Sequence, residues 1–244
     1  MVEIKIARVP GLADWWADPK PSNDGFPSWI KDLRKEKLVD NKLNMSDCLP
    51  AIEAMLQGII IDFPATMTFG YLGDHPKFGK LITCDHKGYP IIGGHESSQY
   101  KGADFQDFHV VKVGLPWVIE APKGYSCLFT SPFNRSGGNE AFSISGFVRC
   151  DSYYNMVSIP FAVPLKKKGD VVIVEKGRPF VQIIPMKRES VEIISSQIDM
   201  KNLETTVNQI NENPGYYKSL AKEQSNRQFN YSFNTVNYNT PQVL

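Results

Sequence analysis

The sequence predicts a mainly β fold, a β-sandwich or β-barrel flanked by short helices at its N- and C-terminal ends. Between residues 58 and 194 the chain contains nine short runs rich in β-branched and aromatic residues, the side chains that are enriched in strands. Pro, Gly, Asn or Asp bounds nearly all of them, so turns rather than long helical patterns separate the runs. This arrangement favours a sandwich or barrel over a parallel α/β sheet. The nine runs are GIIIDFPATMTF, KLITCD, FHVVKV, PWVIEAP, YSCLFTSP, AFSISGFV, SIPFAV, DVVIVEKG and PFVQIIPMKRE.

Residues 1–26 form the first segment and contain Trp15 and Trp16 among Pro, Gly and Asp. Such a composition leaves no room for a regular element longer than one turn. We therefore expect an extended N-terminal arm that its tryptophans fix to the body.

Residues 27–57 read as a helical lead-in to the β-rich core domain of residues 58–194. A short helix is expected in PSWIKDLRKE, and a longer one in MSDCLPAIEAMLQG. For the second helix, Ser46 or Asp47 is the expected N-cap and Gly58 the C-terminal stop.

Residues 121–135, APKGYSCLFTSPFNR, illustrate how one strand and its corner are encoded. We expect a turn at Gly124, a strand after it, and an end at Pro132, which has no N–H to continue a ladder. Asn134 and Arg135 then lie in a loop, where polar side chains can bind a partner.

After residue 194 the apolar spacing becomes helical again, and residues 195–224 are expected to form helices. Asp199 is the expected cap of the first, and NPG at 213–215 ends it. The Asn-rich tail, residues 225–244, alternates polar and aromatic side chains and cannot build its own core. It is either disordered or an arm that packs on a neighbour. The apolar positions of the first helix are Met200, Leu203, Val207 and Ile210.

Composition excludes several classes of function. The 27 Lys and Arg against 26 Asp and Glu leave a net charge of +1, so no global field attracts nucleic acid or an anionic membrane. The four cysteines form no C-x-x-C pair, which is typical of reduced thiols in a reducing compartment. The first residues lack a signal-peptide pattern and no apolar run is long enough to span a bilayer. We expect a protein without membrane contact, cytoplasmic when it is made.

Common catalytic motifs are absent, including the G-x-S-x-G elbow, the P-loop, G-x-G-x-x-G and H-E-x-x-H. All four histidines lie between residues 75 and 109, but turns explain their positions better than a metal site, so we expect no metal and no cofactor. His95 in GGHESSQY is the best functional candidate among them. Two glycines before it allow a close backbone approach, and Glu96 or Gln99 can orient its ring.

Three elements in fixed order carry a family resemblance: PKGYSCLF, then SGFVRCDSYYNMVSIPF, then VVIVEKGRPFVQIIP. Over residues 115–187 this order resembles the trimeric dUTPase and dCTP deaminase superfamily. The resemblance implies a β-clip, or distorted jelly-roll, fold, a homotrimer and a nucleotide pocket.

Only some residues of this chain match the family pattern of that implied pocket. Asp151, Tyr153 and Gln182 match the family pattern. Ser131 lies where the family has its phosphate-binding arginine, and it can still donate a hydrogen bond. Arg149 stands where the family places the aspartate that activates water. A guanidinium stays protonated and can only donate, which argues against hydrolysis by the family mechanism but allows an anion to be held.

A second resemblance covers residues 45–189 and is to a family of bacterial and phage proteins of unknown function. It rests on CLPAIEAMLQGIIIDFPA upstream and on KGRPFVQIIPMKRE at the end. The Asn- and Lys-rich composition also suits a phage protein.

The leading interpretation is a non-catalytic phage-type β-clip protein, a homotrimer, whose arms and tail contact other copies or other phage structural proteins, including in a virion. One alternative is a nucleotide-binding or nucleotide-hydrolysing enzyme with a rearranged site at His95, Asp151, Tyr153 and Gln182. Another is a module that sequesters an anionic small molecule, held by three arginines. These are Arg135, Arg149 and Arg188.

Overall fold

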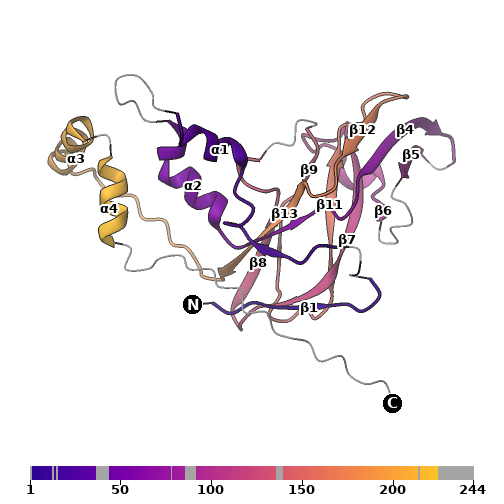
Figure 1. The fold of residues 1–244 in the computed structure, drawn as a ribbon, viewed down its shortest axis with the longest axis horizontal. Helices are drawn as coiled ribbons and strands as arrows, with labels where there is room; N and C mark the ends of the chain where they lie inside the picture. Colours follow the sequence, from indigo (N-terminus) through magenta and orange to yellow (C-terminus); the bar gives the residue numbers. More distant parts are fainter. Residues whose placement is uncertain are drawn as a thin grey trace, which may run out of the picture.

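Antiparallel sheets form the body of the protein in the computed structural model, which describes residues 2–12, 14, 16–36, 44–77, 79–85, 92–135, 140–213 and 215–224 (Figure 1). The first sheet has the order β1 (Lys5–Arg8), β7 (His109–Glu120), β11 (Met156–Val163), β9 (Phe142–Ser143), and β6 (Ile92–Gly94) also pairs with β7. The second has the order β10 (Gly146–Val148), β8 (Tyr125–Thr130), β13 (Pro179–Lys187), β3 (Ile59–Asp62), β2 (Lys20–Pro21). The third has the order β12 (Val171–Val174), β4 (Met67–His75), β5 (Gly79–Asp85). The predicted mainly β fold with flanking short helices is confirmed.

Strand β7 joins two runs that the sequence separates at Pro116. Its partner β11 pairs Ser158 with Gly114 and then Met156 with Val118, so the register shifts around the proline. Proline offers no N–H to the ladder, and an irregularity of this kind is how a strand passes one. The two predicted strands are therefore one strand with a bulge.

An aromatic cluster fills the space between the sheets. Phe180 lies 4.4 Å from Phe63 and 5.6 Å from Phe161, measured between ring centroids. Trp16, in the N-terminal arm, is 4% exposed and packs against Trp117 at 5.4 Å. The arm is thus fixed to the body by a tryptophan, and it contributes β1 and β2 to the sheets.

The lead-in consists of α1 (Ser28–Leu33), the short 3-10 turn η2 (Met45–Asp47) and α2 (Leu49–Leu56). The sequence predicted Ser46 or Asp47 as the N-cap of α2, which is wrong. Cys48 is the N-cap residue, because Ser46 and Asp47 belong to the 3-10 turn that Asn44 caps. A separate small core holds these helices together. Its buried members are Ile30, Ile52 and Met55, against which Phe26, Leu56 and Phe133 pack.

Gly58 ends the lead-in as predicted. Its φ is +64°, and a Cβ at this position would lie 1.9 Å from the carbonyl oxygen of Ile183 on β13. Only glycine permits this close passage of α2 into β3.

Strands β10 and β11 follow each other in the chain but do not pair as a hairpin. Strand β10 pairs with β8 in the second sheet, whereas β11 pairs with β7 in the first. The turn between them, residues 149–155, crosses from one sheet to the other.

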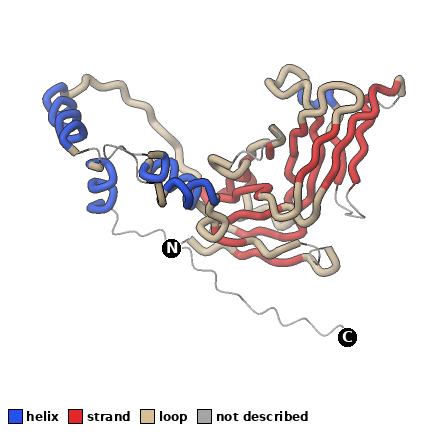
Figure 2. The backbone as a smooth tube through the Cα atoms, turned by 45° about the horizontal axis from the view of Figure 1, so that its top comes forward, coloured by secondary structure: helices blue, strands red, loops and turns tan. Residues whose placement is uncertain are grey.

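Beyond β13 the chain continues without regular structure to α3 (Met200–Glu212) and α4 (Tyr216–Gln224). Asp199 caps α3 by accepting a hydrogen bond from the N–H of Asn202 at 3.1 Å, as predicted. The backbone view shows a long connection that carries α3 away from the sheets (Figure 2). The predicted Asn-rich tail lies outside the described residues, and among the residues that are described no helix is both long and apolar enough to span a bilayer.

Candidate functional site

Asp151 is the centre of the candidate site, and its carboxylate is held on two sides. Both guanidinium nitrogens of Arg188 donate to it, one to Oδ1 at 3.0 Å and the other to Oδ2. The N–H of Gly124 also donates to Oδ2, at 2.9 Å. The carboxylate is 6% exposed, whereas the Arg188 side chain is 36% exposed. This bidentate pair joins the turn after β10 to the end of β13.

Arg188 is itself fixed by β8. Its guanidinium donates to the carbonyl of Tyr125 at 2.6 Å and to the hydroxyl of Ser126 at 3.1 Å. Its backbone N–H donates to the carbonyl of Gly124 at 2.8 Å. The ion pair is therefore one part of a network that closes the start of β8.

The protonation of Asp151 follows from this network. The hydrogen bonds from Arg188, and after them the bond from Gly124, hold the pKa of the carboxyl well below its usual range. A general base must take up a proton near neutral pH. Asp151 is ionised there but bound to two donors, so it is unsuited to this role.

Next to Asp151, an exposed turn presents aromatic side chains and one arginine. We call residues 147–154, which include the last two residues of β10 and most of the turn after it, the aromatic turn. Its rings are exposed by 63% at Phe147, 46% at Tyr153 and 73% at Tyr154. Arg149 is exposed as well, and its carbonyl accepts the N–H groups that close the turn. Aromatic and arginine side chains of this kind are enriched at protein interfaces.

Gln182 belongs to the packing of the protein rather than to this surface. It is fully buried, and its amide nitrogen donates to the carbonyls of Ala54 at 2.9 Å and Gln57 at 2.7 Å. Its amide oxygen accepts the N–H of Phe133 at 3.0 Å. The side chain thus ties β13 to α2 and to the corner after β8.

Asn134 and Arg135 bind the N-terminal segments of the same chain. The guanidinium of Arg135 donates to the carbonyl of Gly25 and, at 3.3 Å, to that of Ser22. Burial lowers the pKa of this arginine, and the charge of Asp62 opposes the effect. Asn134 donates to the carbonyl of Ala51 at 3.4 Å.

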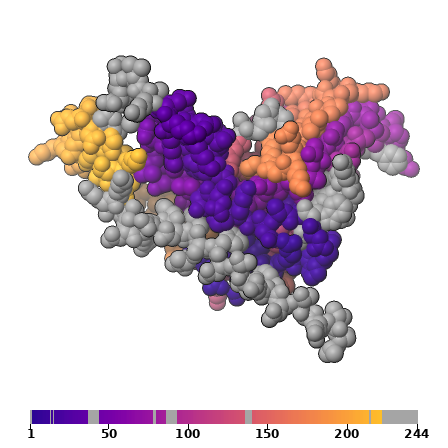
Figure 3. Space-filling model, in the orientation of Figure 1, coloured from indigo at the N-terminus to yellow at the C-terminus, as the bar shows by residue number. Residues whose placement is uncertain are grey.

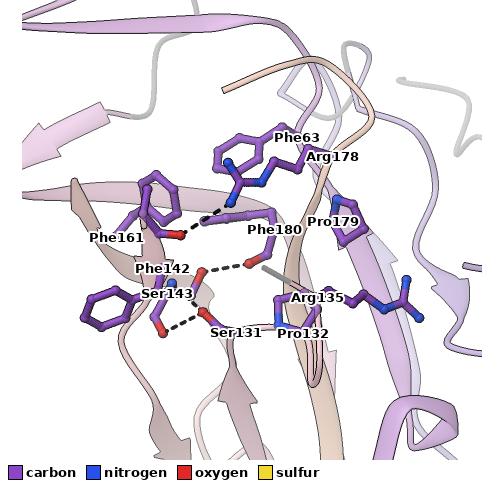
Figure 4. Close-up of a pocket in the computed structure, with 11 residues that line it drawn as sticks. Phe63, Ser131, Pro132, Arg135, Phe142, Ser143, Phe161, Arg178, Pro179 and Phe180 are labelled. Carbon is purple, nitrogen blue, oxygen red and sulfur yellow. Dashed lines mark hydrogen bonds between the residues drawn. The ribbon is translucent and has the colours of Figure 1, made fainter. Parts of the chain in front are cut away.

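Ser131 lies beside a small hollow between the sheets (Figure 4). Its hydroxyl accepts the N–H of Ser143 at 2.7 Å and donates to the carbonyl of the same residue at 3.2 Å. The hollow has room for about one water molecule. Figure 4 shows the guanidinium of Arg178 among the phenylalanine rings, whereas that of Arg135 points away from the serines. The hollow is therefore too small for a nucleotide.

His95 and Gln99 form a pair of their own near β7. The ring Nδ1 of His95 and the amide oxygen of Gln99 are 2.7 Å apart, as the sequence suggested, and the backbone N–H of His95 donates to the carbonyl of Val110 at 3.0 Å. Gln99 is exposed, and the described residues contain no cluster of three or more His, Cys, Asp or Glu that could hold a metal ion.

The candidate site residues lie in separate parts of the structure. Asp151 and Arg188 meet at the Tyr125 end of β8, while Gln182 pairs with Thr130 at its other end. The geometry does not assemble the three arginines into one anion site, nor His95, Asp151, Tyr153 and Gln182 into one pocket. Those that it does bring together are Arg149, Asp151, Tyr153 and Arg188.

His109, which the sequence analysis assigned to a turn together with the other histidines, is instead a buried residue at the start of β7. It is 1% exposed, neither ring nitrogen has a hydrogen-bond partner, and its ring lies 4.5 Å from that of Tyr71. Burial lowers its pKa to about 4, with the charge of Lys80 adding to the effect and that of Asp74 opposing it. Its place at the start of a predicted strand was the only available signal.

Comparison with known proteins gives structural matches only. No protein-family model matches the sequence, and no curated protein matches it. The chain is similar to phage dUTPases. A dUTPase mutant of Staphylococcus bacteriophage 80alpha, solved with dUpNHpp, is 12% identical with a TM-score of 0.36, and the match covers 81% of this chain and 90% of that one. A second mutant of that dUTPase with dUpNHpp is 12% identical with a TM-score of 0.35, covering 81% and 98%.

A mutant dUTPase from phage phi11 of S. aureus is 10% identical with a TM-score of 0.35, and the match covers 81% of this chain and 99% of that one. These structures are all of dUTPases, the kind of protein in the first resemblance described for the sequence. The resemblance to bacterial and phage proteins of unknown function stays a prediction.

Proposed function

We propose that this protein is a non-catalytic, β-clip-like protein of phage type that acts by binding copies of itself and other proteins. The fixed carboxylate of Asp151 is the observation that carries the proposal. Arg188 and Gly124 occupy it, and the arginine next to it in the turn, Arg149, cannot accept a proton. Of the other two matches to the family pattern, Gln182 is used within the fold and Tyr153 is an exposed residue of the aromatic turn.

Exposed apolar side chains support association as the alternative to catalysis. Two segments are rich in them, the aromatic turn and the stretch from 191 to 210 after β13. In the second, Val191 is 85% exposed, Ile193 92% and Ile194 77%. Contiguous apolar surface of this kind marks interaction sites in soluble proteins.

Product analysis tests the non-catalytic part. Purified protein is incubated with each canonical deoxynucleoside triphosphate and with dUTP, with and without Mg²⁺, alongside Asp151→Asn as the matched variant. We expect neither protein to exceed the rate without protein. Turnover by the wild type that Asp151→Asn abolishes would identify Asp151 as a catalytic group and refute the proposal.

Light scattering of the full chain tests the binding part. We propose a homo-oligomer, with a trimer as the favoured state, made in the cytoplasm. A virion location is the finer prediction: detection of the chain in washed phage particles would support it, and its absence from them would restrict the protein to the cell. A monomer at all accessible concentrations contradicts self-association.

Anion or nucleotide binding without hydrolysis is the second candidate, and the composition of the aromatic turn favours it. An exposed guanidinium at Arg149 suits phosphate, and the ring of Tyr153 offers a surface on which a base can stack. Calorimetry with dUTP and with pyrophosphate compares the wild type, Arg149→Ala and the nearby control Lys123→Ala. Heat that only Arg149→Ala removes supports the site. Equal heats for all three proteins remove Arg149 from it.

A further inference from the structure

Helix α3 presents a narrow apolar stripe that no described residue of its own chain buries. Its four apolar side chains recur at spacings of three, four and three residues, and each is between 43% and 54% exposed. All its other side chains are polar. The four residues of this stripe are Met200, Leu203, Val207 and Ile210.

The spacing identifies the kind of surface that the stripe fits. A helix that packs on a sheet or in a globular core shows a wider apolar face, whereas a stripe restricted to alternating three and four spacings is the seam of a coiled coil. The surface that best complements such a seam is another seam of the same kind.

The placement of α3 makes it available to a second molecule. The chain from Met186 to Thr205 is exposed at every residue, and no regular element supports the connection from β13. Figure 3 shows α3 and α4 as a lobe at the opposite end of the molecule from β4 and β5. Holding four apolar side chains in water on a projecting helix costs free energy that burial against a partner recovers.

We propose that α3 pairs in antiparallel orientation with α3 of a second copy of this chain, an inference that rests on the proposed self-association and adds to it a two-fold contact, which joins two single copies or one copy from each of two trimers. In this orientation Met200 faces Ile210 of the second copy, and Leu203 faces Val207 of the second copy. The contact is isologous, so both copies use the same four residues.

Charge decides the orientation. A parallel pair would bring Asp199 of one copy, at the flanking position before the seam, close to Glu204 of the other, and like charges there are unfavourable. The antiparallel pair has one such contact, between the two copies of Glu204, where the parallel pair has two, and it aligns the two helix dipoles head to tail.

The length of the helix sets the strength of the contact. Thirteen residues make a seam roughly 20 Å long, which is short for an isolated helix pair. The contact is therefore expected to be weak alone and to act together with other contacts between copies.

Sedimentation velocity of the full chain over a range of concentrations tests the proposal. The seam variant Leu203→Glu/Val207→Glu is compared with Thr205→Glu/Asn208→Glu, which adds the same charge to the same helix away from the seam. We expect the seam variant to need at least tenfold more protein for the same degree of association, and the control to behave like the wild type.

The outcomes separate this inference from the proposed function. Association of the seam variant at wild-type concentrations overturns the α3 contact and leaves self-association through other surfaces intact. A wild-type chain that is monomeric throughout overturns both.

Disulfide trapping tests the orientation in a Cys48→Ser background. Met200→Cys and Ile210→Cys proteins are mixed under mild oxidation. The antiparallel pair predicts that mixed dimers form faster than either homodimer. Faster formation of the Met200→Cys homodimer would refute the antiparallel arrangement.

Discussion

Replacing Gln182 with leucine removes the side chain that ties β13 to the lead-in helix and keeps nearly the same volume. The amide makes three hydrogen bonds in a fully buried position, two as donor and one as acceptor. Its removal therefore leaves polar groups of three other residues without this partner. Because Gln182 is fully buried, water cannot take the place of its side chain unless the fold opens locally.

The expected loss in the free energy of unfolding follows from the hydrogen bonds that each partner keeps. The N–H of Phe133 loses its acceptor, which costs about 1–3 kcal/mol for a buried donor. The carbonyl of Ala54 keeps the N–H of Gln57 at 3.4 Å, and the carbonyl of Gln57 keeps the hydroxyl of Ser22 at 2.6 Å. Each lost bond there costs about 0.5–1 kcal/mol. The more favourable burial of leucine offsets about 1 kcal/mol, so a net loss of about 1–4 kcal/mol is expected.

Urea unfolding followed by tryptophan fluorescence measures this loss. The matched control is Gln209→Leu on the exposed face of α3, which should change the free energy of unfolding by less than about 0.5 kcal/mol. Gln182→Glu adds a second signature. A carboxylate facing two carbonyls is unfavourable, so this variant should lose stability as the pH rises. Wild-type stability in Gln182→Leu, together with loss of a bound ligand or partner, would refute the structural role.

Three further predictions concern other parts of the fold. Gly58→Ala should lower the free energy of unfolding by at least about 2 kcal/mol in urea, because the new Cβ meets the carbonyl of Ile183 in a left-handed backbone conformation; a change under about 0.5 kcal/mol would contradict the close approach. His109 has a pKa of about 4 when folded, below its value in the unfolded chain, so stability is complete at pH 7 and falls between pH 6.5 and pH 4. About 2 kcal/mol should be lost by pH 5, and His109→Phe should remove this part of the pH dependence. With a thiol reagent, Cys48 should react first because it is the exposed cysteine, and the buried Cys127 and Cys150 should react slowly until the protein unfolds; equal rates for these three would contradict the burial of the last two.

The parts of the fold that depend on local sequence could be predicted. Helix α3 has its cap at Asp199 and its apolar spacing within one short stretch, and both are found as expected. Gly58 also acts as the stop that its position indicates. In each case the deciding interactions lie within a few residues along the chain, where propensity and capping are informative.

The candidate site could be predicted only in part, because its roles depend on distant partners. Gln182 resembles a ligand residue in sequence, yet its hydrogen bonds go to residues more than 120 positions earlier as well as to Phe133. Asp151 is paired with Arg188, which lies 37 residues further along the chain. Neither contact leaves a signal in the local pattern. The same limit explains β7, where only the pairing with β11 shows that the chain continues past Pro116.

The measurement that tests the central claim most directly is the titration of the Asp151 carboxyl carbon by NMR in the wild-type protein, with Arg188→Ala as comparison. The account predicts that the Asp151 signal keeps the shift of an ionised carboxylate from pH 8 down to pH 4, since Arg188 and Gly124 hold its pKa well below the usual range. In Arg188→Ala the pKa should rise, because the largest stabilising interaction of the carboxylate is lost. A wild-type midpoint near neutral pH would mean that Asp151 can exchange a proton as a general base does, and it would contradict the non-catalytic account.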